Sequence, residues 1–236
     1  MADSAQLSDE LVFLPLGGCE EIGMNLNAYG YGPPHARRWI LVDVGVTFGG
    51  LDTPGIDLIC ADPDFLIGEQ IDAIFLTHAH EDHIGAVGLL YPRLKTKAPI
   101  YATPFTTELV RSKMIERGVD ARWLKPVALG GTVVAGPFTV TYVTLTHSIP
   151  EPNALAIDTP AVMILHTGDW KIDPDPQIGG PTDIKGLTAL GDRGVLAMVC
   201  DSTNVFEEGE SGSEESVKQG LIGLIAEQTQ AVAVTT

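Results

Sequence analysis

Short apolar runs bounded by glycine, proline and polar residues recur along most of the chain and predict β-strands. The clearest run, residues 71–76 (IDAIFL), is rich in β-branched and aromatic residues and predicts a buried strand. Further strands are expected at residues 11–16, 25–31, 39–45, 98–102, 161–165 and 194–200, and as two short strands within 133–146. The runs 39–45 and 194–200 are continuous enough to predict buried strands as well.

Helices are expected between these strands. Residues 84–90 predict a helix that faces a core. A second helix is expected to have Thr103 as its N-cap and Pro104 in its first turn, and to stop at Gly118. A chain of 236 residues with this arrangement is long enough for one substantial α/β domain with its own core.

The pattern changes after the acidic linker 207–213 (EEGESGS). Ser211 or Ser213 is expected to cap a helix that follows the linker. The apolar residues of this helix form one stripe: Val217, Leu221, Leu224 and Ile225. Residues 231–236 predict the start of another strand. We expect the exposed stripe and the unpaired strand edge to favour association.

Four possible metal ligands, His78, His80, Asp82 and His83, fall within six consecutive positions directly after the strand 71–76. In a strand-to-helix turn, two histidines spaced two apart can face one side while the later pair reaches a neighbouring point. Two metal centres can therefore share one loop. Neutral imidazole and carboxylate suit zinc, whereas magnesium and calcium take oxygen ligands. The alternative is a solvated polar loop, but clustered His and Asp residues favour a metal site.

Three further candidates stand at the ends of other apolar runs. Asp43 needs a partner, because a carboxylate at the end of a buried strand is costly to leave alone, and either a strand-end cap or the histidine loop can supply it. His147 leaves a strand for a proline-marked loop and can supply the third nitrogen that zinc prefers. Asp169 follows another strand, with Gly168 allowing close backbone approach, and is the candidate bridge between two metals.

The remaining histidines and the cysteines show no ligand pattern. His35 is expected at the surface, and His166 is expected to be packed within its strand. The cysteines are odd in number and never form a Cys-x-x-Cys pair, so they indicate neither a disulfide framework nor a thiolate zinc site. We expect all three to be small core residues: Cys19, Cys60 and Cys200.

The chain is 44% hydrophobic, with a net charge of −17. No apolar stretch reaches membrane-spanning length, and residues 1–6 lack the order of a secretion signal, which predicts a cytoplasmic protein with no membrane partner. The acidic charge argues against a basic nucleic-acid groove without metals. Two bound divalent ions would locally reverse that field.

The motif His78-x-His80-x-Asp82-His83 resembles the signature of the metallo-β-lactamase superfamily, which implies an αββα sandwich and leaves the substrate open. Within that superfamily the chain most resembles the ribonuclease J branch of the β-CASP nucleases. This closer resemblance is carried by segments 16–25, 77–85, 147–150 with 166–169, and 201–204. Small-molecule hydrolases of the superfamily share the histidine loop but not the segment at Asp201.

The resemblance implies a zinc-dependent ribonuclease that hydrolyses RNA phosphodiesters as an endonuclease, a 5′-to-3′ exonuclease or both. The implied ligands are His78, His80 and His147 for one zinc, Asp82 and His83 for a second, and Asp169 between the two. The residues implied in catalysis are Asp82, Asp169 and Asp201. Asp201 would hold a histidine from beyond residue 236, and Asp43 would orient the histidine loop. RNA is the implied partner, and the full-length protein is implied to be a homo-oligomer.

The resemblance also implies a longer protein with a β-CASP domain inserted after Asp201. Residues 1–205 are then expected to form the amino-terminal part of the catalytic domain, which is incomplete at its carboxyl end, and residues 206–236 the acidic linker and the start of the β-CASP domain. Such a fragment would have an incomplete second zinc site and little or no activity alone. Two alternatives stay open: a small-molecule metallo-hydrolase of the thioesterase or lactamase type, and a non-catalytic interaction module braced by metal.

Overall fold

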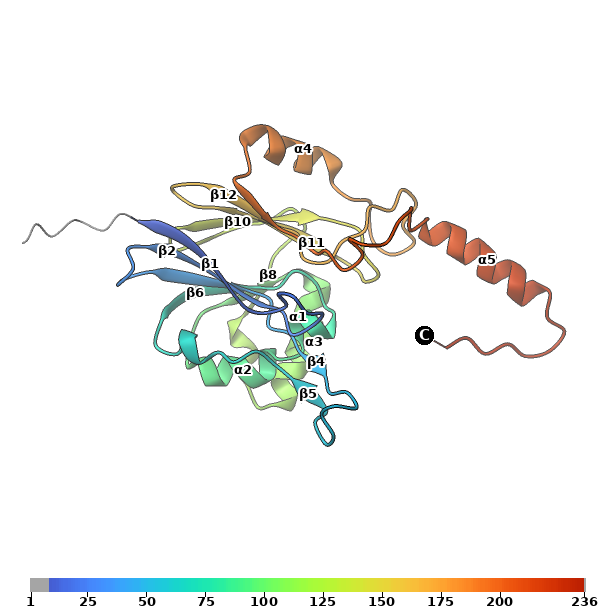
Figure 1. Ribbon diagram of the computed structural model, residues 1–236, viewed down its shortest axis with the longest axis horizontal. Coiled ribbons are helices and arrows are strands. Elements are labelled where there is room, and N and C mark those ends of the chain that lie inside the picture. Colours follow the sequence, from blue (N-terminus) through green and yellow to red (C-terminus); the bar gives the residue numbers. More distant parts are fainter. Residues whose placement is uncertain (1–8, 236) are drawn as a thin grey trace, which may run out of the picture.

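The computed structural model describes residues 9–235 and contains two β-sheets packed face to face (Figure 1). Residues 1–8 and Thr236 lie outside the described part, and with them the segment examined for a secretion signal and the last residue of the strand predicted at 231–236. The first sheet has the strand order β1-β2-β3-β6-β7-β8, and the second has the order β13-β12-β11-β10-β9.

The first sheet consists of β1 (Glu10–Gly17), β2 (Leu26–Gly32), β3 (Arg38–Val42), β6 (Gln70–Phe75), β7 (Ile100–Ala102) and β8 (Leu124–Pro126). The second consists of β9 (Thr132–Ala135), β10 (Phe138–Thr144), β11 (Asn153–Asp158), β12 (Met163–His166) and β13 (Ala197–Val199). A separate pair is formed by β4 (Thr47–Phe48) and β5 (Leu58–Ile59). Two single 3-10 turns are η1 (Asp64–Leu66) and η2 (Ala121–Trp123).

Helices cover the outer face of each sheet, which gives the αββα sandwich that the sequence predicts (Figure 1). α2 (Val87–Leu94) and α3 (Pro104–Glu116) pack on the first sheet through residues such as Leu90. α4 (Ile184–Arg193) packs on the second sheet through Leu190. An aromatic-rich core fills the space between the sheets, and its largest members are Tyr29, Phe75, Phe138 and Tyr142.

The strand directions bring several strand ends to one edge of the molecule. β3, β6, β7 and β8 are parallel, so their carboxyl ends lie together. In the second sheet β10, β12 and β13 run in one direction, because β11 is antiparallel to both β10 and β12, while β13 is parallel to β12. The Asn153 backbone N–H donates to the Thr77 carbonyl oxygen at 3.2 Å, so the two edges meet at the loop after β6.

Most predicted elements are present, with shifted ends. The helix expected at 84–90 is divided, because α1 (Glu81–Ile84) is a single turn that ends before α2 begins. Gly118 has a φ of 68° and ends the turn after α3, as predicted. Two elements of the second layer, β11 and α4, were not predicted.

Two predictions about the later part of the chain are wrong, and one about the cysteines holds only in part. β13 is an edge strand rather than a buried one, with Met198 60% exposed, because it pairs only with β12 among the described strands. Residues 231–235 form no strand. Of the three cysteines expected in the core, Cys19 is exposed and Cys200 is half-buried. Cys60 is also half-buried, but it packs against the core of the first sheet.

The last helix, α5 (Glu214–Ala226), projects away from the two sheets (Figure 1). Ser213 is its cap, and its side chain accepts a hydrogen bond from the Ser216 N–H at 3.2 Å. No residue of α5 is buried, and its apolar stripe is exposed as expected. The exposed apolar residues are Val217, Leu221, Ile222, Leu224 and Ile225.

Candidate metal centre

The loop that follows β6 holds three histidines where the two sheet edges meet. His78 is fully buried, His83 is 2% exposed and His80 is half-buried. The single turn of α1 begins at Glu81, so Asp82 and His83 lie in its first turn, beside the loop that carries the other two histidines. The cluster is therefore built into the protein rather than displayed on a solvated loop.

One group of possible ligands joins His78 and His80 to His147 and Asp169, with one ligand atom of each residue within 4.8 Å of the others. His80 Nδ1 lies 3.1 Å from His78 Nε2 and 3.1 Å from His147 Nε2. A zinc ion with bonds of about 2.0–2.1 Å separates tetrahedral ligand atoms by roughly 3.3 Å. Both of these distances suit a tetrahedral zinc site, and Asp169 lies close enough to be its fourth ligand.

A second group consists of Asp82, His83 and the same Asp169. His83 Nε2 lies 3.2 Å from Asp169 Oδ1 and 3.5 Å from Asp82 Oδ2. The other carboxylate oxygen of Asp169, Oδ2, lies 3.7 Å from His147 Nε2. Each oxygen of Asp169 thus faces a different group, as a carboxylate between two cations would.

A buried network behind the ligands fixes the orientation of two imidazoles. His83 Nδ1 donates to Asp43 Oδ2 at 2.7 Å, which leaves Nε2 free to face Asp169. The Thr77 hydroxyl lies 2.9 Å from Asp43 Oδ2 and 3.0 Å from His78 Nδ1. Because the single hydroxyl proton goes to Asp43, the His78 Nδ1–H must be the donor, and its Nε2 keeps the lone pair that a metal ion would need.

Asp43 adopts a φ of 62° directly after β3, which is uncommon for a residue other than glycine. Its carboxylate also accepts the Thr77 backbone N–H at 2.8 Å. Asp43 therefore has the partner that its buried position demands, and that partner is the histidine loop. Gly168, after β12, packs closely against Thr77. A side chain at this position would clash, because its Cβ would lie 2.9 Å from the Thr77 Cβ.

The two buried histidines of the cluster, His78 and His83, differ in their ionisation. Burial, followed by the neighbouring His83, His147 and His80, lowers the pKa of His78 well below its usual value, so the His78 imidazole is neutral, as a metal ligand must be. Burial also disfavours the charged form of His83, but Asp43 and Asp169 outweigh it and raise its pKa to about 10. A proton and a metal ion therefore compete for His83 Nε2.

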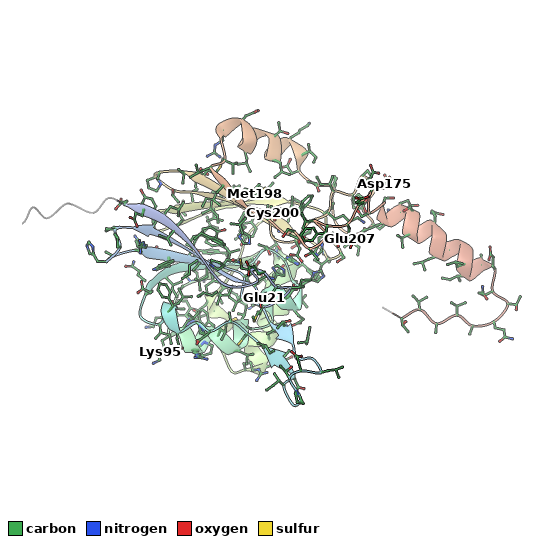
Figure 2. The ribbon with its side chains drawn as sticks, in the orientation of Figure 1. Glu21, Lys95, Asp175, Met198, Cys200 and Glu207 are labelled. Atoms are coloured by element: carbon green, nitrogen blue, oxygen red, sulfur yellow. The ribbon has the colours of Figure 1, made fainter. Side chains whose placement is uncertain are left out.

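A cavity of about 350 Å³ opens beside the second group. Its lining includes Glu20 and Glu21 from the loop after β1, and Cys200 and Asp201 from the end of β13. Glu21 and Cys200 are labelled in Figure 2 and line the cavity from the two sheets. With Asp82 and Asp169, the lining carries five carboxylates, so an anion can enter only if cations compensate them.

Asp201 and His166 line this cavity but belong to neither ligand group. Asp201 Oδ1 accepts from the Thr203 N–H at 2.9 Å and from its hydroxyl at 2.7 Å. His166 is buried, as expected, with Nδ1 2.9 Å from the Tyr29 hydroxyl. His35 is exposed, as expected.

Two residues near the ligands were not assigned a role from the sequence. Thr77 connects Asp43 to His78, and the Asn25 side-chain nitrogen lies 3.2 Å from His83 Nε2 and 3.1 Å from the Asp82 carbonyl oxygen. A supporting role for Thr77 could have been predicted from its position between the strand 71–76 and His78. Asn25 lies 57 residues before Asp82, and no local pattern marks it.

The model of the β-lactamase superfamily domain matches residues 38–188, about two thirds of the chain. The chain belongs to the β-lactamase superfamily. The matched range contains both ligand groups and Asp43, and it ends before Asp201. A His/Asp metal cluster at the edge of the sandwich accords with this membership.

Ribonuclease J from Sinorhizobium meliloti is 48% identical over 99% of this chain and 42% of its own length. Ribonuclease J from Corynebacterium glutamicum is 40% identical over 94% of this chain and 30% of its own length. The protein of the same name from Helicobacter pylori 26695 is 37% identical over 94% of this chain and 32% of its own length. The chain matches the amino-terminal part of ribonuclease J and spans less than half the length of these relatives.

A solved structure of a protein of unknown function from Enterococcus faecalis V583 has a TM-score of 0.63 with this chain at 19% identity. The alignment covers 92% of this chain and 58% of that one, and the likeness is one of fold alone. None of the described helices is long and apolar enough to cross a membrane.

Proposed function

We propose that this chain carries the metal centre of a ribonuclease of the ribonuclease J type, which hydrolyses RNA phosphodiesters with two zinc ions. The observation that carries the proposal is the pair of ligand groups sharing Asp169, in a chain 48% identical to a ribonuclease J. We include both endonucleolytic and 5′-to-3′ exonucleolytic cleavage in the proposal. The acidic cavity supports metal dependence, because a phosphate next to five carboxylates requires compensating cations.

The donor atoms fit zinc better than magnesium or calcium, because four of the six proposed ligands are imidazoles. When bound, two zinc ions would supply a hydroxide near neutral pH and neutralise charge on the phosphate oxygens. His78, His80 and His147 would hold the first ion, and Asp82 and His83 the second, with Asp169 between them. Thr77 and Asp43 would keep His78 and His83 in the tautomers that ligation needs.

Asp201 would act at the rim of the cavity. Its Oδ1 is engaged by Thr203, and we propose that its Oδ2 orients the group that protonates the leaving oxygen. We also propose that residues 1–205 belong to the catalytic domain and that 206–236 form an acidic linker and the start of a second domain. The absence of any buried residue in α5 supports this boundary.

The test is a chimera in which this chain replaces the matching amino-terminal part of the S. meliloti ribonuclease J. We expect the zinc-loaded chimera to cleave a 5′-monophosphorylated single-stranded RNA. Asp82→Asn should abolish cleavage, and His35→Ala, at an exposed histidine outside both ligand groups, should leave it unchanged. A folded chimera that binds zinc and leaves RNA intact would contradict the proposal. Hydrolysis of a thioester or a lactam by the 236-residue chain would favour a small-molecule hydrolase instead.

A further inference from the structure

The described contacts that hold α5 to the rest of the protein are polar and lie mainly at its first turn. The Glu214 backbone N–H donates to Asp173 Oδ2 at 2.8 Å. The Glu214 side chain accepts the backbone N–H groups of Gln177 at 2.6 Å and Ile178 at 3.3 Å. One turn later, Lys218 Nζ donates to Gln177 Oε1 at 2.8 Å. Because no residue of α5 is buried, these hydrogen bonds determine where the helix begins relative to the sheets.

Asp173 is a buried carboxylate, only 4% exposed. It accepts the Asp175 N–H at 2.9 Å and pairs with Lys171 Nζ at 2.9 Å, in addition to the bond from Glu214. The negative charge of Asp173 is therefore balanced by Lys171 and by two backbone N–H groups, one from its own loop and one from α5. Removing one donor from a buried carboxylate is costly, so a shift of α5 must move Asp173 or leave it underbonded.

The loop of Asp173 is tied to the strand ends that carry two proposed ligands. Lys171, two residues after Asp169, donates its backbone N–H to the Thr146 carbonyl oxygen at 2.8 Å, and the two residues form an antiparallel bridge. Thr146 directly precedes His147, and its hydroxyl accepts the Asp173 N–H at 3.2 Å. Thr146 is itself 2% exposed, so this connection passes through the packed interior, where a displaced side chain must move its neighbours.

We infer that Asp173 is a positioning residue for the metal centre and that Glu214 couples the position of α5 to it. Glu214 contacts Asp173, and Asp173 contacts both Thr146 and Lys171. Thr146 directly precedes His147, and Lys171 lies two residues after Asp169. The inference rests on the proposed metal site but not on RNA as the substrate. If Asp173 only organised a local turn, changes at the start of α5 would leave zinc affinity untouched.

Glu214→Pro isolates the coupling. Proline removes the backbone N–H that Asp173 accepts and also removes the carboxylate. It is compatible with the first position of a helix, and Ser213 already has the extended conformation that precedes proline, with φ −115° and ψ 155°. Helix α5 should therefore persist while its attachment is lost. Glu215→Ala is the matched control, because it removes the next carboxylate of α5, which accepts from Lys218 and Gln219, and keeps every donor and acceptor that joins α5 to the loop of Asp173.

Zinc affinity of the 236-residue chain, measured by competition with a chromophoric chelator, is the first readout. Hydrogen exchange of residues 170–178 is the second. We expect Glu214→Pro to weaken zinc binding about tenfold and to speed exchange in this segment, as for a residue that supports ligands from behind. Glu215→Ala should change neither. Asp173→Asn should weaken zinc binding further, and Glu214→Ala, which keeps the N–H, should fall between the parent and Glu214→Pro.

Equal zinc affinity in Glu214→Pro, Glu215→Ala and the parent would overturn the coupling while leaving the metal site intact. Faster hydrogen exchange without a change in zinc affinity would also overturn the coupling, because it would show that the contact between Glu214 and Asp173 only attaches α5. A parent chain that binds no zinc would overturn the proposed metal centre itself, and the coupling with it.

Discussion

The histidine loop and helix α5 both carry sequence patterns that suggest a function, but the protein supports them differently. The loop 77–83 is enclosed by both sheets, and its residues contact Asp43, Asn25 and Gly168 from distant parts of the chain. α5 has an apolar stripe and no buried residue. Contacts from distant elements fix the side chains of the histidine loop in one arrangement, and this arrangement indicates a binding site. The apolar stripe of α5 indicates an interaction surface but not what binds there.

The largest expected effect tests the enclosed loop. His78→Ala should remove the first zinc and the stabilisation that zinc gives, about 4 kcal/mol at a free zinc concentration near 1,000 times the Kd. The measurement is metal content together with the melting temperature with and without zinc. His35→Ala, at an exposed histidine, is the control. Equal metal content in the His78→Ala variant and the parent would remove His78 from the ligand set.

An effect of similar size concerns the core between α2 and the first sheet. Leu90 lies on α2, is 3% exposed and belongs to the core under the first sheet. Leu90→Ala should lower the free energy of unfolding by about 2–5 kcal/mol, because it leaves a cavity that the core cannot fully close. Urea unfolding measures this change. A loss below 1 kcal/mol would indicate that this layer is looser than its burial suggests.

Asp43→Asn is expected to have a smaller and more specific effect. Asparagine tolerates the left-handed backbone at this position, so the substitution changes the charge facing His83 with little backbone strain. Zinc affinity should fall about 10- to 100-fold without being abolished, as for other residues that orient a ligand. If only stability falls and zinc affinity is unchanged, Asp43 is a strand-end cap and not a support of the metal centre.

The smallest effect is expected in α5. Leu221 is 43% exposed, so Leu221→Ala should change the free energy of unfolding by less than about 0.5 kcal/mol. The same substitution should reduce self-association at high concentration, because it shortens the exposed stripe. Light scattering and urea unfolding separate the two quantities. A loss as large as that of Leu90→Ala would show that α5 is packed in solution.

The sequence alone determined the elements whose signals are local. The run 71–76, the four candidate ligands after it, and the positions of Asp43, His147 and Asp169 at strand ends all follow from residue type and spacing. The αββα sandwich followed from the resemblance that these residues carry. β11 and α4 escaped prediction, as did the exposure of β13, because burial of a strand depends on its neighbours in the sheet and not on its own apolar content.

Only the tertiary structure decided which ligands meet. His147 lies 67 residues after His80, and their ring nitrogens come within 3.1 Å because β10 and β12 end at the edge where β6 ends. The two groups around Asp169, the support from Thr77 and Asn25, and the connection from Asp173 to α5 all depend on strand pairing and register. Sequence periodicity describes one element at a time, whereas these contacts join elements that hydrogen bonding between strands has brought together.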